Sequence, residues 1–235
     1  MRKFNSTSLL IFCCFTANAQ LTYDRTDFER INGAYSNLTS LQTTVDYVYY
    51  PNHYSKNPGE TLQAVLSVQG DSYRYRLADM ETLVSPAKTL LIDHEEKKIM
   101  LDVGHQSLKQ ILFGADLDKL LSVCSRIQFS YPEQGVKKYE LYADLAETER
   151  IDLYFDTSNF MMRRVVLYYK EPMMPEYGGT GEKPRLELVY RRQNTTPQFA
   201  ANQFSIERFV HKVGDRYVAA AAYRNYQILD ATSNR

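Results

Sequence analysis

The chain of 235 residues has no tryptophan, only three cysteines and no long apolar stretch beyond its N-terminal region. Cys13 and Cys14 lie near the N-terminus, which leaves Cys124 as the single cysteine of the remaining chain. A lone cysteine cannot form an intrachain disulfide or complete the paired-cysteine patterns of zinc sites. Nothing reaches the roughly 20 apolar residues that a membrane-spanning helix requires. We therefore expect a hydrophobic core to stabilise one or at most two domains.

Residues 1–19 have the layout of a cleavable secretory signal peptide. The basic pair Arg2 and Lys3 precedes a short apolar run over residues 9–17, and small residues end in Ala19, which suits a signal peptidase. This run is too short to span a bilayer as a helix. We expect cleavage after Ala19, no transmembrane segment in the mature chain, and a periplasmic location, with secretion as the second choice.

The chain has no excess of charge of either sign, with 28 basic and 28 acidic residues. Loss of Arg2 and Lys3 with the leader leaves 26 basic groups and a net charge of about −2. A nucleic-acid partner requires a concentrated basic face. The balance of charge therefore predicts no nucleic-acid partner.

Two helical regions and many strands follow from the spacing of apolar residues. Spacings of three and four predict helices over residues 24–41 and 106–122. Period-two alternation predicts strands near residues 44–49, 62–68, 73–77, 80–85, 89–93, 98–103, 126–131, 138–145, 150–155, 161–169, 186–191, 209–213 and 217–221. Short connections favour antiparallel neighbours.

The order of elements predicts a mainly β protein with helices, of the α+β class. No internal repeat and no Pro, Gly or Ser-rich linker divides the chain. Because strand twist accumulates across a large sheet, we expect one strongly curved antiparallel sheet. It would form a half-closed barrel whose open mouth is covered by helices.

Catalytic and metal-binding patterns are missing from the sequence. His53, His94, His105 and His211 lack the spacings that direct two imidazoles to one metal. Gly178 to Lys183 precedes a strand that starts at Pro184, whereas a phosphate loop must open a helix. Residues 93–96 are typical of a turn, and Cys124 of a small buried apolar residue. We predict no enzymatic activity, no metal and no cofactor.

Nineteen tyrosines are the most unusual feature of the composition. Tyrosine has a large apolar ring with a polar tip, which suits the wall of a cavity for an amphiphile. Ordinary sheet packing and cross-strand pairing is the alternative interpretation, and composition alone favours it. The strand tyrosines are Tyr47, Tyr49, Tyr73, Tyr75, Tyr139, Tyr142, Tyr154, Tyr168, Tyr169 and Tyr190.

Several segments, in this order, resemble the LolA family of periplasmic carriers that take lipoproteins towards the outer membrane. They are Thr61–Val68, Gly70-Asp71, Tyr73–Leu77, Val84–Leu90 at the place of the family's Val-Ser-Asp-Gly-Lys-Thr segment, Ile151–Asp156 and Phe204–Ile206. The resemblance implies a half-barrel over residues 20–210 with an apolar cavity for acyl chains. Residues 211–235 would be a C-terminal strand or tail extension.

We therefore expect a non-enzymatic binder or carrier of lipoprotein acyl chains or other lipids, with outer-membrane lipoprotein sorting as one setting for it. The candidate cavity lining is Tyr47, Leu66, Val68, Tyr75, Leu77, Leu153, Phe155 and Leu167. The candidate lid is Leu108, Ile111 and Leu112. The family's latch arginine is replaced by Gln69-Gly70, so its release mechanism is not implied here.

An alternative is a structural or interaction subunit of a cell-envelope assembly with the same fold. The loop over residues 173–183 and the tail over residues 211–235 exceed the family pattern. Both would then serve as docking surfaces for an envelope protein partner.

Overall fold

The computed structural model describes residues 23–86, 88–102, 117–172 and 181–231. The predicted leader and the predicted lid residues Leu108, Ile111 and Leu112 lie outside these ranges. The helices and strands are α1 Arg25–Ser36, β1 Ser40–Tyr50, β2 Glu60–Gln69, β3 Ser72–Leu77, β4 Met80–Val84, β5 Thr89–Asp93, β6 Lys98–Asp102, α3 Leu117–Ser122, β7 Cys124–Glu133, β8 Val136–Ala143, β9 Thr148–Asp156, β10 Met162–Tyr169, β11 Arg185–Asn194, β12 Val210–Val213, β13 Arg216–Ala219 and β14 Gln227–Asp230.

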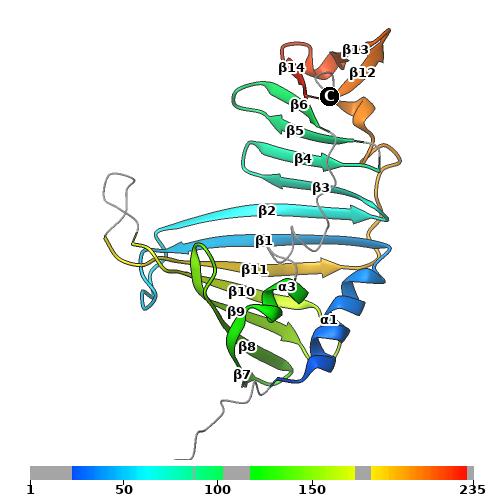
Figure 1. Ribbon diagram of the computed structural model, residues 1–235. Coiled ribbons are helices and arrows are strands. Elements are labelled where there is room, and N and C mark those ends of the chain that lie inside the picture. The colour runs from blue at the N-terminus through cyan, green and yellow to red at the C-terminus, as the bar shows by residue number, and fades with distance from the viewer. Residues whose placement is uncertain (1–22, 87, 103–116, 173–180, 232–235) are drawn as a thin grey trace, which may run out of the picture.

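One large curved sheet organises the molecule (Figure 1). Its 12 strands follow the order β14-β6-β5-β4-β3-β2-β1-β11-β10-β9-β8-β7, and β12 and β13 form a separate hairpin. Every pairing in the large sheet is antiparallel except the one between β14 and β6. The predicted curved, mainly antiparallel sheet is therefore confirmed. β14 and β7 are its two edges, so the sheet is not closed.

The first helix is shorter than its apolar spacing predicted. It begins after the Asp24 cap, whose carboxylate accepts a hydrogen bond from the Thr26 amide at 3.0 Å. It ends at Ser36, and Leu41 belongs to β1 instead. Leu41 fits both a helical spacing and the strand alternation that continues to Val45. It lies in the strand, where its side chain is buried in the sheet core.

The main hydrophobic core lies on the face of the sheet that α1 covers, which we call the inner face. Phe28, Ile31 and Tyr35 of α1 are buried there against β-strand residues such as Leu153 and Phe155. α3 adds Leu117 and Leu120 to the same cluster. Both described helices therefore pack on one side of the sheet, as Figure 1 shows around β8 to β10.

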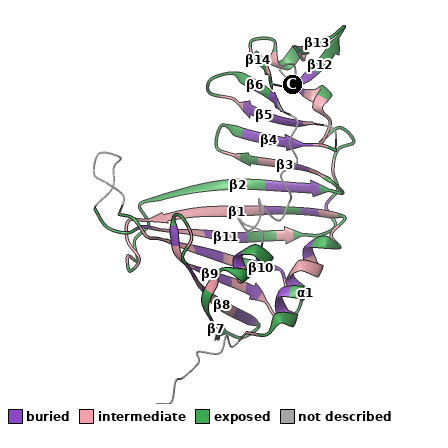
Figure 2. Ribbon diagram, in the orientation of Figure 1, coloured by how far each residue is buried: buried purple, intermediate pink, exposed green. Residues whose placement is uncertain are grey.

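A second core lies on the opposite face, which we call the outer face. Neighbouring residues on a strand point to opposite faces, and Val84 belongs to the main core whereas Leu83 belongs to the second one. Figure 2 shows buried stretches on β4 and β5. The second core contains Leu83, Leu90, Ile92, Ile99, Leu101, Phe209 and Val210. The sheet thus changes its covered face between β3 and β5.

The C-terminal segment, residues 204–230, covers the second core. Its last strand, β14, pairs in parallel with β6 and was not predicted from the sequence. The predicted turn at residues 93–96 connects β5 and β6, and its His94 Nδ1 lies 2.9 Å from the Tyr226 hydroxyl. Phe209 and Val210 are buried, whereas the described residues after Val210 are partly buried or exposed. No described helix is long and apolar enough to cross a membrane.

Candidate functional site

An apolar hollow of about 370 Å³ opens at one end of the inner face. Tyr49 on β1 and Leu186 on β11 are register partners in its floor. Tyr169 comes from the end of β10, Ala146 from the turn between β8 and β9, and Pro184 from the start of β11. Its wall is therefore built mainly from apolar and aromatic groups.

The position of the hollow follows from where α1 lies. Helix α1 leads into the first residue of β1, whereas Tyr49 is near the last residue of that strand. In Figure 1 these two ends of the sheet lie far apart. The helix fills the inner face at its own end, and the opposite end is left uncovered by α1. Exposed Ala146 shows that the hollow reaches the surface.

The eight residues predicted to line a cavity share the inner face, but they divide into two groups. Leu66, Val68, Leu153 and Phe155 are at most 1% exposed and belong to the main core. Tyr47, Tyr75, Leu77 and Leu167 are partly buried and pack against that core. Leu167 pairs with Leu186 of the hollow, and Tyr47 pairs with Leu188 beside it. Their role as ligand contacts stays a prediction.

A pair of tyrosine hydroxyls lies on the inner face near the hollow. The Tyr75 hydroxyl donates a hydrogen bond to the Tyr47 oxygen at 2.8 Å. Burial raises the pKa of both phenols, and the hydrogen bond to Tyr47 adds to the rise for Tyr75. Both phenols therefore stay neutral at physiological pH. Their two hydroxyls are a small polar group on an otherwise apolar surface.

Acidic side chains form part of the lining of the hollow. Glu147 and Glu171 line it and are exposed. Burial raises the pKa of Tyr169, and the nearby Glu147 carboxylate adds to the rise. Lys183 Nζ lies 2.9 Å from Glu149 Oε2, and this contact raises the lysine pKa. The charge of Lys183 is therefore largely compensated.

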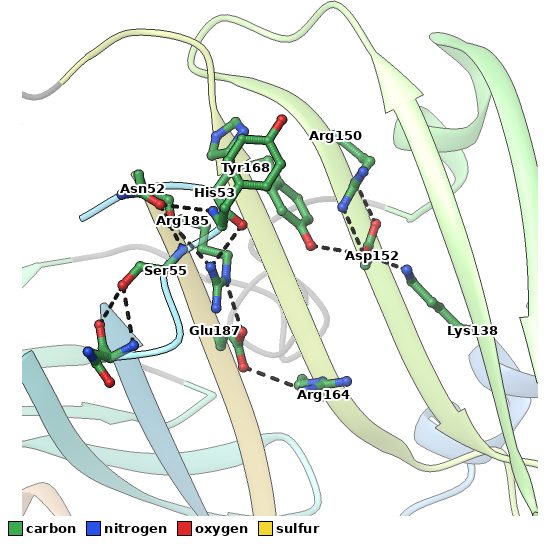
Figure 3. Close-up of polar contacts among 12 residues, drawn as sticks. Asn52, His53, Ser55, Lys138, Arg150, Asp152, Arg164, Tyr168, Arg185 and Glu187 are labelled. Atoms are coloured by element: carbon green, nitrogen blue, oxygen red, sulfur yellow. Dashed lines mark hydrogen bonds and ion pairs between the residues drawn. The ribbon is translucent and has the colours of Figure 1, made fainter. Parts of the chain in front are cut away.

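The outer face beside this end carries a polar network around Asp152 (Figure 3). The Asp152 carboxylate is fully buried, with Lys138 Nζ at 2.9 Å and Arg150 Nε at 3.0 Å. The Tyr168 hydroxyl donates to the same carboxylate at 3.2 Å. Burial raises the pKa of Asp152 against the opposing effect of the two cations. The carboxylate is held by partners within the fold, as a buried charge requires.

Tyrosines on the outer face are stacked with arginines. Each of these guanidinium carbons lies within about 4 Å of a ring centroid, well inside the roughly 6 Å over which cation–π contacts are favourable. The pairs are Arg126 over Tyr142 at 3.7 Å, Arg150 over Tyr168 at 3.8 Å, Arg185 over Tyr50 at 3.8 Å and Arg164 over Tyr154 at 4.0 Å. On this face tyrosine serves sheet packing, whereas Tyr47, Tyr49 and Tyr169 lie at or near the hollow.

A loop after β1 is fixed against the strands that bound the hollow. Arg185 Nη1 donates to the carbonyl oxygens of Asn52 at 3.1 Å and His53 at 2.9 Å (Figure 3). His53 Nε2 donates to the Tyr169 carbonyl at 3.1 Å. These bonds tie the loop to the ends of β10 and β11. The wall of the hollow is therefore preorganised.

Cys124, the one cysteine among the described residues, is not an activated nucleophile. The Cys124 thiol donates to the Leu120 carbonyl at 3.2 Å, and burial raises its pKa to about 11. A thiol with such a pKa is protonated and unreactive at neutral pH. Within the described ranges no group of three or more His, Cys, Asp and Glu could hold a metal ion.

Sequence reasoning missed most of the residues that line the hollow. Tyr49 carried a signal, because it follows Tyr47 by two positions and shares its face. Ala146, Glu147, Glu171 and Pro184 lie in turns or at strand ends, where no periodicity marks a face.

No protein-family model matches the sequence, and a search of curated proteins finds no match. Solved structures do match. An uncharacterized conserved protein from Thermus thermophilus is 10% identical, with 88% of this chain and 98% of that chain covered and a TM-score of 0.47. MucB in the Pseudomonas aeruginosa MucA/MucB complex is 13% identical, with 83% and 62% covered and a TM-score of 0.44.

This chain therefore spans somewhat under two thirds of the MucB chain. The LolA superfamily protein NE2245 from Nitrosomonas europaea is 9% identical, with 77% of this chain and 96% of that chain covered and a TM-score of 0.36. The description of that protein names the LolA superfamily, the family whose motifs were compared with this sequence above.

Proposed function

We propose that the protein is an exported, periplasmic and non-enzymatic binder or carrier of acyl chains. In this proposal the leader is removed after Ala19, and the half-barrel over residues 20–210 holds a lipid or a lipoprotein acyl chain in the hollow at Tyr49 and Leu186. Outer-membrane lipoprotein sorting would be its physiological setting. The observation that carries the proposal is the apolar wall of an open hollow on the inner face.

Burial of methylene groups is sufficient to drive such binding. Each methylene transferred from water contributes about 0.8 kcal/mol, so a chain needs no catalytic group to be held. The volume of about 370 Å³ lies within the range of small-molecule sites. Partly buried Leu167 and Tyr47 extend the apolar surface from the hollow towards the core.

A substitution that fills the hollow tests the proposal. The mature chain is titrated with N-phenyl-1-naphthylamine, an uncharged fluorescent probe of apolar sites. Ala146→Phe places a ring in the hollow from an exposed turn, so it disturbs no core residue. We expect probe affinity to fall by about tenfold or more, in line with the area that the ring occludes.

Ala201→Phe is the matched control, because Ala201 is exposed in a turn and does not line the hollow. It should leave probe affinity unchanged. Native mass spectrometry of protein purified from a periplasmic extract should also detect bound lipid. Absence of both lipid and probe binding in the unmodified protein would remove the proposal.

A second candidate function is an interaction subunit of an envelope assembly. It is favoured by β7, an edge strand of 10 residues on which Phe129 is 46% and Tyr131 62% exposed. An edge strand offers unpaired backbone groups to which an extended segment of another protein can add. Recovery of a partner that Phe129→Lys/Tyr131→Lys abolishes, with no lipid detected, would favour this candidate over the carrier.

A further inference from the structure

Several carboxylates lie at the open end of the hollow, which we call its mouth. Glu147 and Glu171 line it, and both are exposed. Glu60 is the register partner of Tyr49 and is also exposed, so it brings a third carboxylate to the same end of the inner face. The head group of a bound chain would come to rest among these acids.

The lysines near this mouth are engaged by other acids. Lys170 forms an ion pair with Asp144 and also donates to the Leu145 carbonyl. Lys183 is paired with Glu149 at 2.9 Å, and His53 Nδ1 lies 3.7 Å from the same glutamate. Lys170 and Lys183 are thus ion-paired with Asp144 and Glu149, and the charge of Lys183 also interacts with the nearby Glu171. Among the described residues named here, five carboxylates accompany two lysines, so their summed electrostatic potential at the mouth is negative.

We propose that the hollow selects acyl chains with an uncharged head group, namely ester-linked or amide-linked chains, and discriminates against free fatty acids. This inference rests on the proposed function. A fatty acid whose chain occupies the hollow would place its carboxylate beside Glu147 and Glu171, and like charges at such distances repel. An ester or amide has no such cost. Because both glutamates are exposed, solvent limits the discrimination to about fivefold.

Displacement of N-phenyl-1-naphthylamine from the mature chain measures this selectivity. The competitors are 1-monopalmitoylglycerol and palmitate, which have the same chain length, each below its micellar concentration. At low ionic strength and a pH of about 8 we expect palmitate to bind about fivefold more weakly. The difference should shrink in about 0.5 M NaCl, where exposed charges are screened.

Glu147→Gln/Glu171→Gln removes the two charges without changing the apolar wall. Palmitate should then bind within about twofold of the monoglyceride when both competitors are measured on this same variant. Asp71→Asn/Glu95→Gln removes the same net charge from two exposed turns away from the hollow, and it should leave the ratio as in the unmodified protein.

Equal affinity for the two competitors in the unmodified protein would overturn the inference, and so would a ratio that the glutamate double variant does not change. In both cases acyl-chain binding itself would stand. Failure of the monoglyceride to displace the probe would overturn the proposed function together with the inference.

Discussion

Lys137 on β8 is joined to Asp27 on α1 by an ion pair, with 2.5 Å between Nζ and Oδ2. Both side chains are less than a tenth exposed. The Tyr139 hydroxyl donates to the same oxygen at 3.0 Å. Burial acts to lower the pKa of Lys137, but bonds to Asp27 and Tyr139 outweigh it and raise that pKa. The lysine is therefore charged, and it attaches the helix to the inner face.

Asp27→Asn should destabilise the protein by about 3 kcal/mol, because it leaves the buried Lys137 charge without its ion-pair partner. Urea unfolding at neutral pH measures the change. Glu29→Gln on the same helix is the control, since Glu29 is 67% exposed in its pair with Arg25 and should cost less than about 0.5 kcal/mol. Equal effects of the two variants would contradict a structural role for the buried pair.

Substitution of Phe209 tests whether the C-terminal segment contributes to the stability of the fold. It is fully buried in the second core, on the outer face. Phe209→Ala should lower the free energy of unfolding by about 3 to 5 kcal/mol. Val213→Ala on the neighbouring strand, where Val213 is 58% exposed, should change it by less than about 0.5 kcal/mol. A small effect of the phenylalanine variant would mean that this segment is only loosely attached.

Most strands were predictable because half-buried sheet positions alternate. Val45, Leu66 and Val68 follow that rule, and most predicted ranges overlap the observed strands. The helix was extended too far because Leu41 also satisfies a helical spacing. β14 was missed because it has four residues, none of them fully buried, and a parallel partner distant in sequence.

The candidate site was only partly predictable. Alternation placed Leu66, Leu153 and Tyr47 on one face, and they do share the inner face. How much of that face α1 fills depends on tertiary packing, which no local pattern encodes. Leu66 and Leu153 therefore lie in the core, whereas the open hollow is at Tyr49 and Leu186.

Asp156 gives a pH-dependent contribution to stability. Hydrogen bonds from Ser158 and Arg163 lower its pKa to about 2. A carboxyl whose folded pKa is depressed stabilises the protein above its unfolded pKa of about 3.9, and this contribution is lost as the pH falls from about 4 to about 2. Because Arg163 is 58% exposed, we expect about 1 kcal/mol.

Asp156→Asn should therefore be less stable than the unmodified protein by about 1 kcal/mol near pH 6, and the difference should narrow progressively from about pH 4 towards pH 2. Urea unfolding over this pH range measures this. The exposed Asp71→Asn serves as control and should show a constant, small difference. A gap for Asp156→Asn that does not narrow in acid would show that its carboxylate does not provide the stabilisation.

Glu81 and Arg74 form a bidentate pair beneath the C-terminal segment. Arg74 Nε and Nη2 donate to the Glu81 carboxylate at 2.5 and 2.9 Å, and the glutamate side chain is 1% exposed. Burial opposes ionisation, but Arg74 and His94 together lower the pKa of Glu81. Arg74→Met would leave this carboxylate buried without its main partner.

The single variant Arg74→Met should cost about 3 kcal/mol at pH 7, and Arg74→Met/Glu81→Gln should cost less, because the double variant leaves no unpaired buried charge. Without Arg74, burial raises the Glu81 pKa, so the cost of the single variant should also shrink near pH 5 as the carboxyl takes up a proton. Urea unfolding of both variants at the two pH values separates these effects. Equal losses in both variants, unchanged by pH, would mean that Arg74 stabilises the sheet through packing of its aliphatic stem and not through its charge.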